Sequence, residues 1–491
     1  MHISALLMPE IVLGSGVLVL LLVLSLLESL QVYSRYIAQL VLLLVLFSMM
    51  FIDVEQPVNL WFGMFVHDSL AYYAKWVLVL ATLFMMFFSK SFMQDAALPA
   101  FEWYPVLLIQ LLGMMVTVSA KHIMSIFLGL ELMYLPLYAL VATPKDNKLA
   151  LEASVKYLIM GGLASGFLLY GMSLLYLVAR SLSLDDIAIA VNDLLIGSDY
   201  VGVFVDQGTA VLLLSVAMVA IVFALVFKFG GGAFFMWVPD VYQGGAFMVV
   251  ALVSSLPKLV LSVLWIRVFL TALLSAKMIW QMPAFVMGII AMVVGGFYGL
   301  VQDNIRRLLA YSSIAHMGLL IVGLSAASSL ATNASLAYVL GYIMASVLIF
   351  TVLGQLRYQG EELIYLKHLQ GIWRSYPAVA VLLAVCVFSL LGMPPFLGFM
   401  TKLYWLFALI DQQYLYIVGL VVLMSVVGCY YYLRVMQAMF FYRDDSIADG
   451  LLLRVDSLRQ GVLIVAGLAI LGLGLYPGWL LGFTAQLLSW R

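Results

Sequence analysis

Four ionisable side chains lie inside long apolar stretches of this sequence: Glu131, Lys228, Lys258 and Lys402. A charged group at the centre of a lipid bilayer costs about 2.5–3.5 kcal/mol on insertion scales, so such groups are rare without a function. Burial and a nearby opposite charge shift the pKa of a lysine in opposite directions, which allows a buried lysine beside a carboxylate to exchange a proton near neutral pH. The four side chains therefore predict a path for protons, in which Glu131 and Lys228 could form an ion pair.

Two further residues are candidates for the same path. His316 lies in Ala-Tyr-Ser-Ser-Ile-Ala-His-Met-Gly, and imidazole is suited to proton exchange. Lys156 begins an apolar segment four residues after Glu152, where it could feed protons from the cytoplasmic face. Each has a structural alternative: the histidine could hydrogen-bond a neighbour, and the lysine could anchor a helix end at the cytoplasmic surface. The four buried charges have one too, as lysines that reach the membrane surface and a paired glutamate.

Two of the lysines flank sequences that interrupt a helix. Lys228 precedes three consecutive glycines at 230–232, and Lys402 follows Gly-Met-Pro-Pro-Phe-Leu-Gly at 392–398. Consecutive glycines and a Pro-Pro pair are unfavourable within a helix. Backbone groups freed by such a break inside a membrane are tolerated only where they line protein or a wet cavity. Paired interrupted helices typically mark the transport site of a transporter.

The surroundings of these residues are those of a membrane protein. The 491 residues are 66% apolar and only 10% charged, against roughly 45–50% and about 25% in a soluble domain. This composition excludes a soluble enzyme and a disordered chain, and a formal net charge of −1 excludes a basic surface for nucleic acid. The leucine-rich runs are continuous and roughly 20 residues long, which favours membrane-spanning helices over a membrane β-barrel.

We expect an all-α polytopic membrane protein with about 14 transmembrane helices, in which the whole chain, 1–491, is a single membrane domain. The predicted spans are roughly 5–27, 36–53, 73–89, 101–119, 122–141, 157–179, 207–229 with a continuation to 242, 246–268, 279–301, 307–325, 334–356, 376–392 with a continuation to 410, 412–437 and 460–486. The longest connections, near 54–72, 180–206 and 438–459, are too short for a soluble domain and could form a hairpin or a surface helix.

The order of the spans predicts an internal repeat. Helices 1–3 occupy about 1–100, helices 4–8 about 101–270, helices 9–13 about 279–440 and helix 14 about 460–486. We expect helices 4–8 and 9–13 to be two repeats, with the broken helices 7 and 12 in fourth place in each. Because five is an odd number, the second repeat must be inverted relative to the first.

The distribution of cations predicts the orientation. Fourteen of the 23 lysines and arginines fall on odd-numbered connections or the helix ends beside them, and six, among them Lys75 and Arg267, fall on the even-numbered ones. Cytoplasmic loops carry the excess of positive charge. We therefore expect both termini on the non-cytoplasmic side.

The sequence has too few ligands for a redox centre or a metal site. The two cysteines, Cys386 and Cys429, both lie in apolar runs, and the five histidines are scattered. These residues cannot form a disulfide scaffold or a four-ligand metal site. We expect no cofactor in this chain, so the energy for transport must come from elsewhere.

Several longer motifs resemble one family of membrane proteins. The motifs are Ser-Ile-Phe-Leu-Gly-Leu-Glu131-Leu-Met, Leu-Glu-Ala-Ser-Val-Lys156-Tyr, Trp237-Val-Pro-Asp-Val-Tyr-Gln-Gly244, Asn304-Ile-Arg-Arg-Leu-Leu-Ala-Tyr-Ser-Ser-Ile-Ala-His316-Met-Gly and Gly-Phe-Met-Thr-Lys402. They are similar to the antiporter-like subunit N of the proton-pumping NADH:quinone oxidoreductase (respiratory complex I), in the family's order across helices 4–13.

The resemblance implies one of three related proton-pumping modules in a membrane arm. It implies proton translocation through Glu131, Lys228, Lys258, His316 and Lys402, which fall on the family's motif positions. It places NADH, FMN, iron–sulfur clusters and quinone in partner subunits and none in this chain. The implied partners are other antiporter-like and small membrane-arm subunits, the lipid bilayer and protons, without nucleic acid. The length of the chain and the bias of its cations favour a bacterial inner (plasma) membrane over the membrane of an organelle.

The sequence departs from the family pattern around helix 7. Gly230 replaces the usual Ser, Ala233 the usual Pro and Phe235 the usual His. The changes remove polar groups expected between Lys228 and Lys258, which argues against a relay through them; water could bridge the gap instead.

Two other functions remain open at this point. A cation/proton antiporter subunit of a multi-subunit exchanger or of a membrane-bound hydrogenase shares this ancestry, and the transported ion cannot be read from the residues. A structural scaffold that does not pump is the second alternative, although retention of the buried charges disfavours it.

Overall fold

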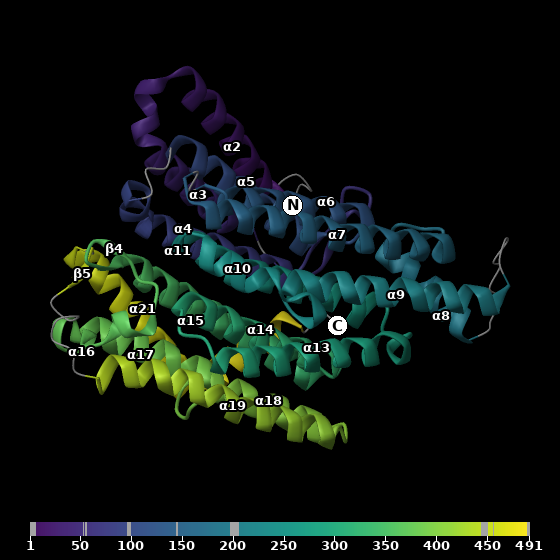
Figure 1. The fold of residues 1–491 in the computed structure, drawn as a ribbon. Helices are drawn as coiled ribbons and strands as arrows, with labels where there is room; N and C mark the ends of the chain where they lie inside the picture. The colour runs from purple at the N-terminus through teal and green to yellow at the C-terminus, as the bar shows by residue number, and fades with distance from the viewer. Residues whose placement is uncertain are drawn as a thin grey trace.

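Long helices run roughly side by side through the whole molecule (Figure 1). This computed structural model describes residues 6–52, 54, 56–95, 100–143, 146–196, 206–442, 450–454 and 456–488. Within those ranges, thirteen helices are long and apolar enough to cross a membrane, which confirms a polytopic helical membrane protein. The remaining predicted span, 376–410, is a pair of shorter helices.

The helices in chain order are α2 (Met8–Leu26), η1 (Glu28–Tyr33), α3 (Ser34–Met49), α4 (Ser69–Asp95), α5 (Ala100–Ser119), α6 (Ile123–Val141), α7 (Lys148–Ala179), α8 (Leu184–Ile196), α9 (Gln207–Phe229), η2 (Gly232–Phe234), α10 (Trp237–Gly244), α11 (Phe247–Ser254), α12 (Leu256–Trp265), η3 (Ile266–Ala272), α13 (Lys277–Leu300), α14 (Ile305–Ser325), α15 (Ser329–Gln355), η4 (Leu366–Leu369), α16 (Ile372–Ser375), α17 (Pro377–Leu391), α18 (Leu397–Asp411), α19 (Leu415–Phe440), α21 (Ser457–Leu475) and α22 (Pro477–Leu487). Helices α14 and α15 lie between the α9–α10 side and the α17–α19 side of the bundle (Figure 1). Within 247–272 a stretch of 18 residues is wholly buried, and stretches of the same length in α14 and α15 are 94% buried, so the core lies where the two predicted repeats meet.

The three longest connections form the small elements expected of them. Strands β1 (Val58–Leu60) and β2 (Phe65–His67) make an antiparallel hairpin. Helix α8 lies in the connection after α7, and strand β5 (Leu451–Leu453) pairs with β3 (Leu356–Tyr358), which also pairs with β4 (Glu361–Glu362). The hairpin and surface helix predicted for these connections are therefore confirmed.

Connections of the same parity meet at the same face of the bundle. On one face, Phe65 bridges to Ala120 and His122 bridges to Ser183. On the other, β5 from the connection after α19 pairs with β3 from the connection after α15. This grouping agrees with an alternating path through a membrane. Which face is cytoplasmic, and the inverted relation of the two repeats, remain predictions.

Both predicted helix breaks are present. Helix α9 ends at Phe229 and is followed by Gly230, whose φ of +81° is a left-handed conformation that favours glycine, and α10 begins after a single 3₁₀ turn. Helix α17 ends at Leu391, directly before Gly392, and α18 begins at Leu397. The broken helices 7 and 12 are thus α9–α10 and α17–α18.

Two further breaks were not predicted. Helix 8 is divided between α11 and α12 at Ser255, two residues before Pro257, and it continues as the π-helix η3. Helix 14 is divided at Tyr476, directly before Pro477. In both places a proline removes a backbone donor inside an apolar run that looks continuous by composition.

Two ion pairs near the β1–β2 face are buried. The orientation was predicted by counting Lys75 and Arg267 among the cations at helix ends on the even-numbered connections, but these residues are only 3% and 4% exposed. Arg267 donates to both carboxylate oxygens of Asp68, at 2.9 and 2.8 Å, and Lys75 pairs with Glu10. Burial, and after it the Lys75 charge, lower the pKa of His67 to about 4. Acidic partners thus allow both cations to leave the surface.

Substitution of Gly398 tests the packing of the second break. A Cβ atom there would lie 1.8 Å from the Ser389 carbonyl oxygen, so Gly398→Ala must displace α18 from α17. We expect this variant to lower the melting temperature and the yield of the assembled protein. Gly419→Ala in α19 is the matched control, because its Cβ would meet nothing within 4 Å and alanine favours a helix by roughly 0.5–1 kcal/mol. Equal melting temperatures for the two variants would contradict the close approach.

Candidate functional site

Glu131 of α6 and Lys228 of α9 form the expected ion pair, with Ser165 of α7 between them. Lys228 Nζ lies 3.8 Å from Glu131 Oε1 and donates to Ser165 Oγ at 3.1 Å. The Ser165 hydroxyl in turn donates to Glu131 Oε1 at 2.5 Å. At an effective dielectric of about 20, charges at this distance attract by about 4 kcal/mol, which offsets part of the cost of burying the lysine.

Close packing of the surrounding helices brings these three side chains together. Gly171 lets α7 approach α9, since a Cβ there would lie 2.8 Å from the Ala217 carbonyl oxygen. Tyr134, one turn after Glu131, donates its hydroxyl to the Lys228 carbonyl at 3.1 Å, and its ring centroid lies 4.3 Å from Lys228 Nζ. The ring face is electron-rich and attracts a cation. Lys228 is therefore surrounded by groups that stabilise its charged form.

Lys258 approaches the same break from the other side. Its Nζ donates at 2.5 Å to the carbonyl of Phe229, the last residue of α9. The same Nζ lies 6.0 Å from the centroid of the Trp237 ring. The residue is 2% exposed. Carbonyls at a helix C-terminus have no intrahelical partner and carry partial negative charge, so a buried ammonium there satisfies both groups.

Lys402 repeats this arrangement at the second break. From the second turn of α18, its Nζ donates to the carbonyls of Leu390 and Leu391 at 3.2 and 3.0 Å. These are the last two residues of α17. In each half of the chain, a lysine that follows the break thus returns to the carbonyls that the break leaves free.

His316 lies close to Lys402. Its Nδ1 hydrogen-bonds the Tyr338 hydroxyl and its Nε2 hydrogen-bonds the Tyr432 hydroxyl at 2.8 Å. His316, Lys402 and Tyr432 line a small cavity of about 30 Å³. A cavity holds a water molecule if it exceeds about 10–15 Å³ and offers two to four polar partners, and this one has both. The cavity is therefore large enough and polar enough for one water molecule beside the histidine and the lysine.

Lys156 lies away from these buried groups. Its side chain is 45% exposed and pairs with Glu152 at 2.7 Å and with Asp240 of α10 at 2.8 Å. Asp240 also accepts from Arg307 at 3.1 Å, and Arg307 donates to the Gln243 side chain at 2.9 Å. Lys156 therefore belongs to a surface charge cluster that holds α10.

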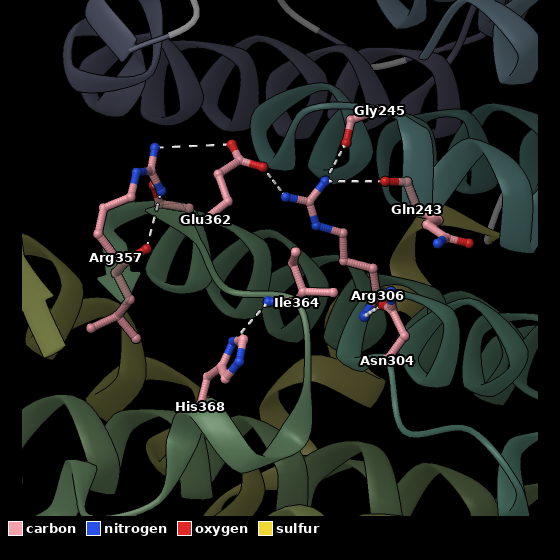
Figure 2. A network of polar contacts seen from close by, with 10 residues as sticks. Gln243, Gly245, Asn304, Arg306, Arg357, Glu362, Ile364 and His368 are labelled. Atoms are coloured by element: carbon pink, nitrogen blue, oxygen red, sulfur yellow. Dashed lines mark hydrogen bonds and ion pairs between the residues drawn. The ribbon is translucent and has the colours of Figure 1, made fainter. Parts of the chain in front are cut away.

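Arg306 fixes the far end of α10, as Figure 2 shows. It donates to the carbonyls of Gln243 and Gly245 at 3.3 and 2.8 Å, and it pairs with Glu362. Glu362 lies between Arg306 and Arg357 (Figure 2), and its Oε1 is 3.9 Å from Nη2 of Arg357. The two consecutive arginines at the start of α14 thus hold α10 at two places. Arg307 binds the Asp240 carboxylate on its surface, and Arg306 binds the carbonyls at its C-terminal end.

The departures from the family pattern fall in different surroundings. A Cβ at Gly230 would lie 3.5 Å from Lys258 Nζ, so a serine there would be next to the ammonium. Phe235 instead packs against the rings of Tyr298 and Tyr311, at 6.1 and 6.5 Å between centroids. The Phe229 carbonyl is the group that contacts Lys258 in this chain.

Several neighbours of the predicted site residues were not found from the sequence. They are Ser165, Tyr134, Trp237, Tyr338 and Tyr432, which are hydroxyl or aromatic residues of apolar helices. In the parts of the chain that the structure describes, no three His, Cys, Asp or Glu side chains gather as metal ligands. The chemistry available here is proton exchange among Glu, Lys, His and Tyr.

Comparison with known proteins agrees with this arrangement. Residues 120–428 match the family model described as NADH:quinone oxidoreductase/Mrp antiporter, transmembrane. NADH-quinone oxidoreductase subunit N of Laribacter hongkongensis is 38% identical over 425 residues, which are 86% of this chain and 84% of the relative. That of Thiobacillus denitrificans is 35% identical over 92% of this chain and 91% of the relative.

Solved structures show the same architecture. A chain of respiratory complex I from Thermus thermophilus, determined with bound aureothin, is 28% identical and covers 96% of this chain and 98% of its own length, with a TM-score of 0.79. A chain of an archaeal membrane-bound sulfane sulfur reductase, 20% identical, shares the fold over 100% of this chain and 98% of its own, with a TM-score of 0.85. By its family model and its relatives, this chain belongs to the family of NADH-quinone oxidoreductase N subunits.

Proposed function

We propose that this chain is the proton-translocating, antiporter-like subunit N in the membrane arm of an NADH:quinone oxidoreductase. The observation that carries the proposal is the placement of a buried lysine on the freed carbonyls of each broken helix, Lys258 at the first and Lys402 at the second. Backbone groups opened inside a membrane and buried charges are both unfavourable, and transport proteins use such places for ion sites.

In this function the Glu131–Lys228 pair sets the charge of the first half. While Glu131 is ionised, attraction of about 4 kcal/mol favours the protonated lysine. Protonation of Glu131, or a shift of α6 away from α9, removes that attraction, and Lys228 then releases its proton. Lys258, His316 and Lys402 take up and pass on protons toward the second half.

The energy for this cycle comes from other subunits. We place NADH oxidation on FMN and iron–sulfur clusters, and quinone reduction, in partner subunits, and no redox cofactor in this chain. Neighbouring antiporter-like and small subunits of the membrane arm deliver the energy as a change in charge or position at the Glu131 side. The chain is thus one subunit of an enzyme complex, and its own chemistry is proton transfer.

The proposed location is a bacterial inner membrane, with both termini on the non-cytoplasmic side. The positively charged face that carries Lys156, Arg306 and Arg307 then faces the cytoplasm. Protons enter the first half from this face, and Lys156 is the candidate for the entry point because its side chain is both solvent-exposed and joined to α10.

Neutral replacements of the buried lysines test the proposal. In inverted membrane vesicles respiring on NADH, we expect Lys228→Met and Lys402→Met to reduce proton uptake per assembled complex to less than about half, since each removes a positioned proton carrier. Lys367→Met, at an exposed lysine of η4, is the control and should pump normally. Normal pumping by both buried variants at normal complex content would overturn the function.

Ser165→Ala tests the hydroxyl between Glu131 and Lys228. The variant loses two charge-assisted hydrogen bonds but keeps the attraction across 3.8 Å, so we expect a partial loss of pumping, smaller than that of Lys228→Met. Ser173→Ala is the matched control, because this exposed serine of the same helix donates to the Tyr170 carbonyl and lies outside the contact between Glu131 and Lys228. The measurement is the initial rate of vesicle acidification at equal complex content, and equal rates for the two variants would remove Ser165 from the site.

A further inference from the structure

A long apolar groove lies between α4, α15 and helix 14, which consists of α21 and α22. Its volume is about 490 Å³, and every side chain that lines it is aliphatic, aromatic or methionine. It follows α4 from Tyr73 to Phe84, a length of about 16 Å at the helical rise of 1.5 Å per residue. A bilayer has roughly 30 Å of hydrocarbon. The groove is therefore about as long as one layer of lipid chains is thick.

The groove is a gap between two places at which α4 meets helix 14. At one end, the rings of Tyr73 and Phe483 lie 5.1 Å apart. At the other end, the Arg459 guanidinium lies 5.7 Å from the centroid of the Phe87 ring. Leu80, between these ends, lines the groove and is 49% exposed. The groove is thus open to the lipid around the helices.

The volume of the groove is that of one fatty acyl chain. Pockets that bind small ligands typically measure about 300–1,000 Å³ and have mostly apolar walls. An engineered apolar cavity of about 150 Å³ holds benzene, so about three times that volume has room for on the order of eighteen carbon atoms. One acyl chain therefore matches both the size and the chemistry of the groove.

Three cations lie at the end of α4 that is close to β3 and β5. Arg35 donates to the Phe87 carbonyl at 3.1 Å, and its Nε is buried without a hydrogen-bond partner among the described residues. Arg459 lies over the ring of the same phenylalanine, and Lys90 is exposed one turn further along α4. Within the described ranges, Asp456 is the one carboxylate that pairs with these cations, 3.7 Å from Arg459 Nε. The cluster therefore has an excess of positive charge.

Positive charge beside an apolar groove is complementary to an anionic phospholipid. Guanidinium groups bind phosphate through paired hydrogen bonds, and basic pockets between membrane helices on the cytoplasmic side bind anionic head groups. The groove ends at Phe84, one turn from Phe87, so a chain that enters it there starts beside Arg35 and Arg459. An apolar helix of a partner subunit would cover the walls of the groove but would bring no anion to these two cations.

We propose that this groove binds one acyl chain of an anionic phospholipid whose phosphate lies against Arg35 and Arg459. The face that carries these cations is the one predicted to be cytoplasmic, so the lipid belongs to that layer of the membrane. The bound lipid joins α4 of the N-terminal helices to α15 of the second predicted repeat and to helix 14. This binding site is separate from the residues of proton transfer.

A phosphatidylglycerol analogue with a photoreactive acyl chain tests the groove in the intact complex. On illumination, we expect the probe to label wild-type peptides of α15 and α21 that line the groove. Ala466→Phe places a ring in the groove and should remove most of this labelling, because the ring takes the volume of the chain. Ala469→Phe, at an exposed alanine of the same helix, is the matched control and should label like the wild type.

Charge variants test the head group with the same probe. Arg35→Gln and Arg459→Gln should each lower the labelling about fivefold, which is the effect of one cation beside an anionic lipid. Arg459→Lys keeps the charge and should label nearly like the wild type. Lys148→Gln, at an exposed cation that begins α7, is the control and should have no effect. A phosphatidylethanolamine analogue should label the wild-type groove weakly.

Three results would overturn the proposal. Equal labelling by the two analogues, unchanged in both glutamine variants, would mean that the groove does not recognise the head group. Cross-linking of the groove peptides to another subunit instead of the probe would identify a partner chain as the occupant. Equal loss of labelling in Ala466→Phe and Ala469→Phe would mean that the probe reports general contact with lipid. None of these measurements depends on pumping, so the proposed function is tested separately.

Discussion

The structure depends on one constraint: inside hydrocarbon, neither an ammonium group nor an open backbone carbonyl can be left without a partner. Lys258 and Lys402 meet this constraint by binding the carbonyls at the ends of α9 and α17. Each break would be costly without its lysine, and each lysine would be costly without its break. A proton that leaves such a lysine weakens the contact with the carbonyls, so protonation and backbone geometry are coupled at the same atoms.

The two halves use this constraint with different chemistry. The first half adds a carboxylate, and Glu131 attracts Lys228 across Ser165. The second half has a histidine between two tyrosines and a small cavity beside Lys402. A carboxylate responds to charge outside the subunit over several ångströms, whereas a histidine and water pass protons locally.

Much of this architecture could be predicted from the sequence, because membrane spans are long and uniform in composition. The breaks at 230–232 and 392–398 were visible because several helix-breaking residues occur together. The break at Ser255 was not, because a single proline two residues later looks like a tolerable kink. Charged residues stood out against an apolar background, but Ser165 did not, since isolated serines are common in membrane helices. Distances such as that between Glu131 and Lys228 arise from helix packing, which no local pattern encodes.

The short helix α10 has a consequence for how the halves communicate. It is only eight residues, about 12 Å, long, with breaks on both sides. Asp240 is on its surface, while Trp237 and Tyr242 are in the core. Because Arg306 and Arg307 hold the same short helix whose Trp237 and Tyr242 side chains contact Lys258 and Ser313, any displacement of α10 at the surface would change both buried contacts together.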